Sequence, residues 1–77
     1  MITSDQIKQW IEQGMACEQV SVEGDGRHFE AMVVSELFSG KNLIERHRMV
    51  YEALGDRMKS DIHALSLQTH TPQEHTA

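Results

Sequence analysis

The side chains with the most chemical potential in this 77-residue chain are five histidines, one cysteine and a short basic run. Imidazole and thiolate are the groups that zinc and iron bind readily in proteins. No two histidines have the paired spacing of a zinc finger or of a His-Glu-x-x-His helix. His63 lies on the same face of a predicted strand as the apolar residues Leu65 and Leu67. It is either a core histidine bonded to a backbone carbonyl or a metal ligand. His28 lies at the mouth of a predicted hairpin, where it matters only if a second ligand comes near.

The single cysteine, Cys17, has two interpretations. It is a metal ligand or redox thiol, or it is a small half-buried filler, as free cysteine often is. We favour the filler, because no basic residue lies within several positions to lower the pKa of the thiol. One cysteine permits no internal disulfide, which is typical of a reducing compartment. With no apolar run of membrane length and no signal-like start, we expect a cytoplasmic protein that does not meet a membrane.

Templates for catalysis are absent, so we expect no enzyme. The acidic residues form no close pair spaced for acid–base work. Ser39-Gly40-Lys41 is similar to the end of a P-loop, but the upstream glycine and the following Ser or Thr are missing.

A basic cluster stands out against a formal net charge of −5. It comprises Lys41, Arg46, His47 and Arg48. The bulk charge argues against non-specific nucleic-acid binding, but a local basic face can still touch phosphates. The alternative is a solvated helix face on which Arg46 and Arg48 pair with Glu45 and Glu52.

The basic cluster lies on the best-defined element, a helix predicted over residues 42–54. Leu43, His47, Val50 and Leu54 recur with helical spacing, and Ile44 and Tyr51 widen the same apolar stripe, which we expect to face the core. Gly55 then ends the helix with a left-handed backbone.

The remaining pattern predicts a small α+β domain. A capped helix begins at Thr3 and stops at Gly14, with Trp10 anchoring it on a sheet. Alternating residues predict strands at 19–23, 29–34 and 62–67, with a turn at 24–26 and a short helix at 56–60. The order is helix-strand-strand-helix-helix-strand, with the second strand central and the third parallel to it. This is a single-layer, mixed three-stranded sheet covered by helices, with residues 70–77 as a flexible tail.

Three stretches together carry a family resemblance, which covers about residues 3 to 72. They are Phe38-Ser39-Gly40-Lys41 with Leu43, Arg46-His47-Arg48-Met49-Val50-Tyr51, and Ile62-His63-Ala64-Leu65-Ser66-Leu67. In this order and spacing they resemble the BolA-like family. The Gly24-Asp25-Gly26-Arg27-His28-Phe29 hairpin and Glu36-Leu37-Phe38 are most similar to its short bacterial acid-stress (IbaG-like) branch.

The resemblance implies a BolA-like fold, similar to class II KH domains, and a function. BolA-like proteins partner monothiol glutaredoxins of the Cys-Gly-Phe-Ser type and share a glutathione-supported [2Fe–2S] cluster, in cluster trafficking, iron sensing or acid-stress response. The family's histidine ligand corresponds to His63. The second ligand comes from the loop between the first two strands, where His28 is the first candidate and Asp25 a weaker one. Cys17, which precedes the first strand, is another weaker candidate. We expect a monomer that forms a heterodimer with its partner.

Two other interpretations remain open beside the cluster. Some BolA-like proteins are regarded as transcriptional regulators, and here Gly40, Lys41, Arg46, His47 and Arg48 would form the partner- or nucleic-acid-binding face. The stretch 39–42 lacks the second glycine of a KH Gly-x-x-Gly loop, so DNA binding ranks second. The protein is otherwise an interaction module that meets glutaredoxin without a cluster.

Overall fold

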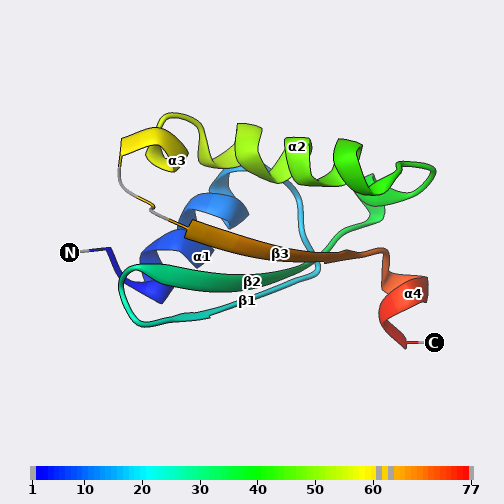
Figure 1. The fold of residues 1–77 in the computed structure, drawn as a ribbon. Helices are drawn as coiled ribbons and strands as arrows, with labels where there is room; N and C mark the ends of the chain where they lie inside the picture. Colours follow the sequence, from blue (N-terminus) through cyan, green and yellow to red (C-terminus); the bar gives the residue numbers. More distant parts are fainter. Residues whose placement is uncertain (1, 61, 63, 77) are drawn as a thin grey trace.

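The computed structural model of the protein describes residues 2–60, 62 and 64–76. Figure 1 shows its elements, which follow the predicted α+β order with one added 3-10 helix and one added C-terminal helix. They are α1 (Ser4–Gly14), β1 (Gln19–Gly24), β2 (His28–Val34), η1 (Glu36–Phe38), α2 (Leu43–Leu54), α3 (Arg57–Ser60), β3 (Ala64–His70) and α4 (Pro72–Thr76).

The three strands form one mixed sheet in the order β1-β2-β3. β1 pairs with β2 antiparallel, and β2 pairs with β3 parallel, so that His28 lies opposite Ala64 and Val34 opposite His70. The central place of β2 and the mixed pairing confirm the prediction. α1 and α2 lie on the same face of the sheet (Figure 1).

The core lies between this helical layer and the sheet. Its side chains come from alternate strand positions and from one face of each long helix. Its fully buried members include Ile7, Ile11, Val33, Phe38, Val50 and Leu54. Trp10 packs against this core, and the guanidinium of Arg57 lies 4.5 Å from the centre of its ring. The core thus ties α1, α2 and β2 into one unit.

Both long helices begin with a reciprocal capping box. Thr3 and Gln6 form the predicted box at α1, with distances of 3.2 and 2.9 Å. Asn42 and Glu45 form a second box at α2, at 2.8 and 3.0 Å. α2 therefore starts at Leu43, with Asn42 as its N-cap.

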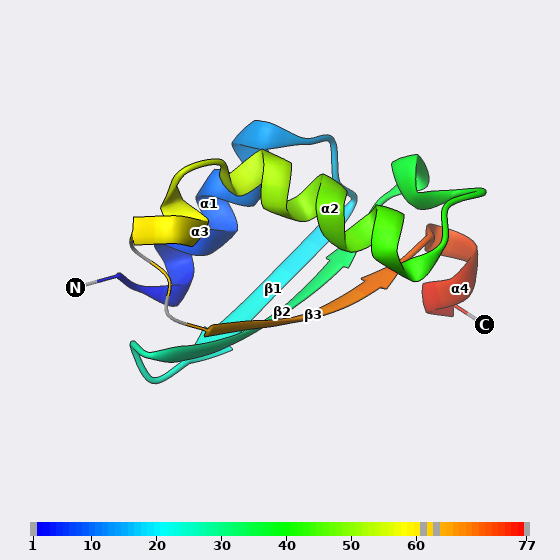
Figure 2. The ribbon, with the colours of Figure 1, turned by 45° about the horizontal axis from the view of Figure 1, so that its top comes forward.

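The crossing of the two helices changes the interpretation of Gly14. We predicted that Gly14 stops the first helix, and α1 does end there, with Met15 as its C-cap, but the structure also gives Gly14 a packing role. A Cβ added there would lie 2.5 Å from the carbonyl oxygen and 2.8 Å from the Cα of Ala53. The absence of a side chain at Gly14 is what lets α1 approach α2, near the C-terminal end of α2 (Figure 2).

The predicted apolar stripe of α2 is wrong at three positions. Leu43, Ile44 and Tyr51 expose 63%, 69% and 39% of their surface. The buried positions, Val50 and Leu54, lie in the C-terminal half, beside the crossing with α1. Helical spacing identified an apolar face, but the structure fully buries only Val50 and Leu54 of α2.

The C-terminal part also differs from the prediction. The third strand runs from Ala64 to His70, rather than over 62–67, because its pairing with β2 continues to Val34. The expected tail at 70–77 contains α4, a five-residue helix that packs at the end of β3. Among the described residues, no helix has the length and hydropathy needed to cross a membrane.

Candidate functional site

The first candidate site is the mouth of the β1–β2 hairpin. There Asp25 Oδ1 accepts hydrogen bonds from the backbone N–H groups of His28 and Arg27, both at 2.9 Å. These two hydrogen bonds, that from His28 first, lower the pKa of Asp25 below its usual range. The Asp25 carboxylate is therefore engaged in stabilising the turn. The imidazole of His28 is consequently the better candidate for a metal ligand.

His28 is exposed on the first position of β2. It lines a shallow hollow of about 270 Å³ together with Glu23, Gly24, Asp25 and Glu30. Its strand partner is Ala64, the first residue of β3. His63, the predicted histidine ligand, lies outside the described residues. Among the residues that the structure does describe, no three His, Cys, Asp or Glu side chains come together as a metal site.

Cys17 lies at the other end of the sheet. The backbone N–H of its neighbour Glu18 donates to the carbonyl of Val34, six residues along β2 from His28. Six strand residues span about 20 Å, so Cys17 and His28 cannot hold one metal centre. The thiol is half-buried, and burial, with a smaller contribution from Glu12, raises its pKa. These surroundings are those of a structural cysteine.

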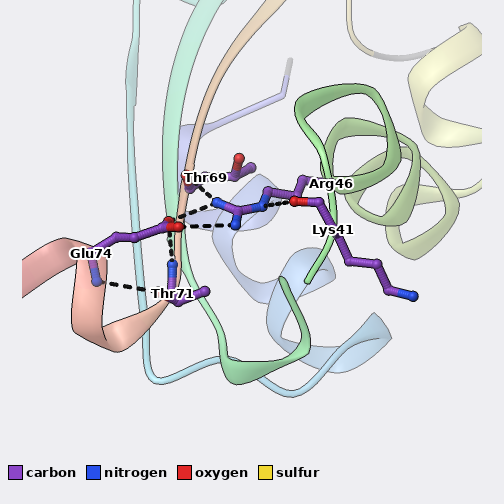
Figure 3. A network of polar contacts seen from close by, with 5 residues as sticks. All are labelled: Lys41, Arg46, Thr69, Thr71 and Glu74. Carbon is purple, nitrogen blue, oxygen red and sulfur yellow. Dashed lines mark hydrogen bonds and ion pairs between the residues drawn. The ribbon is translucent and has the colours of Figure 1, made fainter. Parts of the chain in front are cut away.

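The second candidate site, the basic cluster, is centred on Arg46 (Figure 3). Its Nη1 and Nη2 donate to the two carboxylate oxygens of Glu74 at 2.7 and 3.0 Å. Its Nε donates to the carbonyl of Lys41 at 2.9 Å, and Nη1 also reaches the carbonyl of Thr69 at 3.4 Å. The guanidinium lies 5.9 Å from the centre of the Phe38 ring. Arg46 thus joins the start of α2 to the end of β3 and to α4.

This network corrects the predicted pairing on α2. Arg46 pairs with Glu74, whereas the carboxylate of Glu45 caps its own helix. The hydrogen bond from Arg46 is the first cause, and that from Thr71 N–H the second, of a Glu74 pKa lowered to about 2. Sequence reasoning missed Glu74, although Thr71-x-x-Glu74 has capping-box spacing and the two residues form that box, at 2.9 and 3.2 Å.

The other members of the cluster divide into surface and interior groups. Lys41 and Arg48 are exposed, and Arg48 makes no ion pair with any described residue. Gly40, with φ of 76°, makes the turn before α2. His47 points inward: its Nε2 is buried with no hydrogen-bond partner among the described residues. His47 is therefore a packing residue of α2, with its ring edge-on to Tyr51 at 6.4 Å.

The two candidate sites lie at opposite ends of the molecule. β3 begins at Ala64, opposite His28, and near its other end the carbonyl of Thr69 accepts a hydrogen bond from Arg46. Figure 1 shows the hairpin turn at one end of the sheet and α4 with the start of α2 at the other. A ligand held by His28 therefore leaves the Arg46 end free.

The fold and site define a small α+β domain with an exposed histidine at one sheet end and a basic helix start at the other. A family model described as BolA-like protein matches residues 8–74. The chain belongs to the BolA-like family, as the resemblance indicated.

Individual relatives agree with this assignment. A solved structure of a bolA protein homologue from Coxiella burnetii is 55% identical, covers both chains fully and superposes with a TM-score of 0.93. The acid stress protein IbaG of Escherichia coli is 32% identical over 72 residues, or 92% of this chain and 86% of that one. The DNA-binding transcriptional regulator BolA of E. coli is 39% identical over 51 residues.

Some relatives are considerably longer than this chain. The match covers 66% of this chain but only 49% of E. coli BolA. In SufE-like protein 1 of Arabidopsis thaliana, which is 45% identical over 62 residues, it covers 79% of this chain and 17% of the relative. A BolA-like domain thus occurs both almost alone and as part of a larger protein.

Proposed function

We propose that this protein partners a monothiol glutaredoxin of the Cys-Gly-Phe-Ser type and shares a glutathione-supported [2Fe–2S] cluster with it. The observation that carries the proposal is the position of His28. Its imidazole is exposed at the end of the sheet where β3 begins, and its strand partner Ala64 directly follows His63 in the sequence. Membership of the BolA-like family supports the same role.

The donor set suits a shared cluster better than one held by this chain alone. Iron–sulfur clusters are usually held by four ligands, mostly thiolates. The only thiol of the chain, Cys17, lies at the far end of the sheet from His28. In the proposal His63 is one ligand and His28 the second candidate, while the partner and glutathione supply thiolates. When bound, the cluster would supply one-electron chemistry or an iron–sulfur unit for transfer.

The residues around His28 have separate tasks in this proposal. Asp25 holds the backbone of Arg27 and His28, which fixes the mouth of the hairpin. The imidazole binds iron only through a deprotonated nitrogen, so protonation competes with ligation. Acid should therefore weaken the shared cluster, which would connect this site with acid stress.

Anaerobic reconstitution with glutaredoxin, glutathione, iron and sulfide tests the proposal. Wild type should give visible absorption and circular dichroism unlike those of the glutaredoxin homodimer. His63→Ala should abolish that difference, and His28→Ala should reduce or abolish it. His75→Ala, an exposed histidine at the other end, is the matched control and should leave the spectrum unchanged. A spectrum that stays that of the homodimer contradicts the shared cluster; binding without a cluster then becomes the better account.

DNA binding is the second candidate function, favoured by the name of E. coli BolA and by the exposed Lys41 and Arg48. Because Arg46 is held by Glu74, Arg48 is the better residue to test. Affinity for duplex DNA should fall steeply with salt and be lost in Arg48→Glu. Absence of binding at physiological salt removes this candidate.

A further inference from the structure

We propose that the guanidinium of Arg46 is a carboxylate-binding site that Glu74 keeps closed, and that an acidic peptide segment of a partner takes the place of Glu74. The proposal concerns the end of the molecule opposite His28 and goes beyond the cluster function.

The Arg46 side chain is fixed by contacts that do not involve Glu74. Nε donates to the Lys41 carbonyl at 2.9 Å, and Nη1 donates to the Thr69 carbonyl at 3.4 Å. The centre of the Phe38 ring, which is fully buried, lies 5.9 Å from the guanidinium. Only 13% of the Arg46 side chain is exposed. Arg46 therefore presents its two terminal nitrogens as a preorganised fork, which is the geometry that binds a carboxylate through both oxygens.

The group that fills the fork belongs to a weakly anchored element. α4 has five residues, and none of them is buried. The Glu74 side chain is 46% exposed, and its other hydrogen bonds are with Thr71, the buried residue that precedes the helix. The donor is thus rigid, whereas the acceptor is carried on a short helix at the surface. Such an acceptor can leave without disturbing the core.

The surroundings of the fork favour an acidic peptide over a nucleic acid. Leu43 lies one helical turn before Arg46 and is 63% exposed, and the neighbouring Ile44 is 69% exposed. A peptide that combines a carboxylate with apolar side chains can use both features. A nucleic-acid backbone offers phosphates but no aliphatic side chains for these two exposed residues. The fork already binds a carboxylate in this structure.

Competition by Glu74 sets the expected size of the effect. The apparent dissociation constant equals the intrinsic one divided by the fraction of molecules in which the fork is open. If Glu74 occupies the fork in 90–99% of molecules, removing it should tighten binding by about 10- to 100-fold. The exposed position of Glu74 makes its substitution compatible with folding, which far-ultraviolet circular dichroism would verify.

The experiment titrates a short peptide of alternating glutamate and leucine into the ¹⁵N-labelled full chain. The readouts are the Arg46 Nε–Hε and Thr71 amide signals in NMR spectra. Glu74→Ala is the opened variant, with Glu74→Gln as a second version that keeps the side-chain shape. Gln73→Ala, exposed on the same helix, is the matched control. Arg46→Lys in the Glu74→Ala background keeps the charge but removes the fork. A single-stranded oligonucleotide of equal charge provides the second arm.

The proposal expects tighter peptide binding in both Glu74 variants, movement of the Arg46 signal, wild-type behaviour of Gln73→Ala, and loss of the gain with Arg46→Lys. It is overturned if the Glu74 variants bind the peptide no better than wild type, or if Arg46→Lys binds equally well. Preferential binding of the oligonucleotide overturns it in favour of a phosphate site. No iron or glutaredoxin is present, so neither result bears on the cluster.

Discussion

Gly14→Ala distinguishes the two roles that this glycine could have. If Gly14 only ended α1, alanine would be neutral or stabilising, because alanine is the better helix former by about 1 kcal/mol. If Gly14 permits the close approach of α2, the added methyl group must displace the backbone of Ala53. The two roles therefore predict opposite signs for the change in the free energy of unfolding.

The magnitude follows from the atoms that the methyl group would meet. The carbonyl oxygen of Ala53 would lie 2.5 Å away and its Cα 2.8 Å away, and both belong to rigid backbone. Overpacking of this kind costs about 1–3 kcal/mol. After the helix-propensity gain, we expect a net loss of about 1–2 kcal/mol. In a domain of this size that corresponds to a fall in Tm of about 5–15 °C.

Urea unfolding and thermal unfolding, each followed by circular dichroism, measure the effect. Gln13→Ala, exposed on the same last turn of α1, is the control and should change stability by less than about 0.5 kcal/mol. Gly14→Ala combined with Ala53→Gly should recover part of the loss, because one of the contacted atoms is the Ala53 Cβ. A Gly14→Ala protein as stable as wild type would refute the close-contact argument.

Three further predictions follow from the caps, the ion pair and the cysteine. Asn42→Ala should cost about 0.5–2 kcal/mol in urea unfolding, because it removes one half of the α2 capping box, whereas Asn42→Asp should keep most of it; equal stability of all three proteins would contradict this. The folded pKa of Glu74, about 2, lies below its ordinary value of 4.5, so its stabilising contribution is complete above pH 4.5 and is lost as the pH falls toward 2. The urea midpoint of Glu74→Gln should consequently fall less than that of wild type over this range, and parallel curves would count against the pairing. Cys17 should react with a thiol reagent more slowly than free cysteine at neutral pH and regain the ordinary rate in urea, because burial raises its pKa; a fast reaction in the native protein would show that the thiol is accessible.

The fold was predictable because its local signals agree with one another. The Thr3–Gln6 box, the turn around Asp25 and the alternation in β1 and β2 each specify a local geometry, and the family resemblance joined them into one topology. The incorrect or incomplete predictions concern features that depend on tertiary contacts. Helical spacing cannot tell that Val50 and Leu54 are the fully buried residues of α2, whereas Leu43 is exposed. The role of Gly14 depends on a residue almost forty positions away.

The candidate site was predictable only in part. The alternation placed His28 at the hairpin mouth, and the topology puts it opposite the start of β3. His63 as a ligand and the glutaredoxin partner rest on the family resemblance and stay predictions. The partner of Arg46 was missed because Glu74 lies 28 residues away, in a segment that we read as a tail. Neighbouring Glu45 was the obvious partner on a helical wheel, but it is used in the cap.

The most direct test of the central claim is to detect histidine nitrogen on the shared cluster. Protein labelled with [¹⁵N]histidine would be mixed with unlabelled glutaredoxin, glutathione, iron and sulfide, and the reduced cluster examined by pulsed electron paramagnetic resonance. The account predicts a nitrogen coupling that changes from the ¹⁴N to the ¹⁵N pattern with the label and disappears in His63→Ala. Nitrogen couplings that do not change with the label would contradict the account, because no histidine of this chain would then bind the iron.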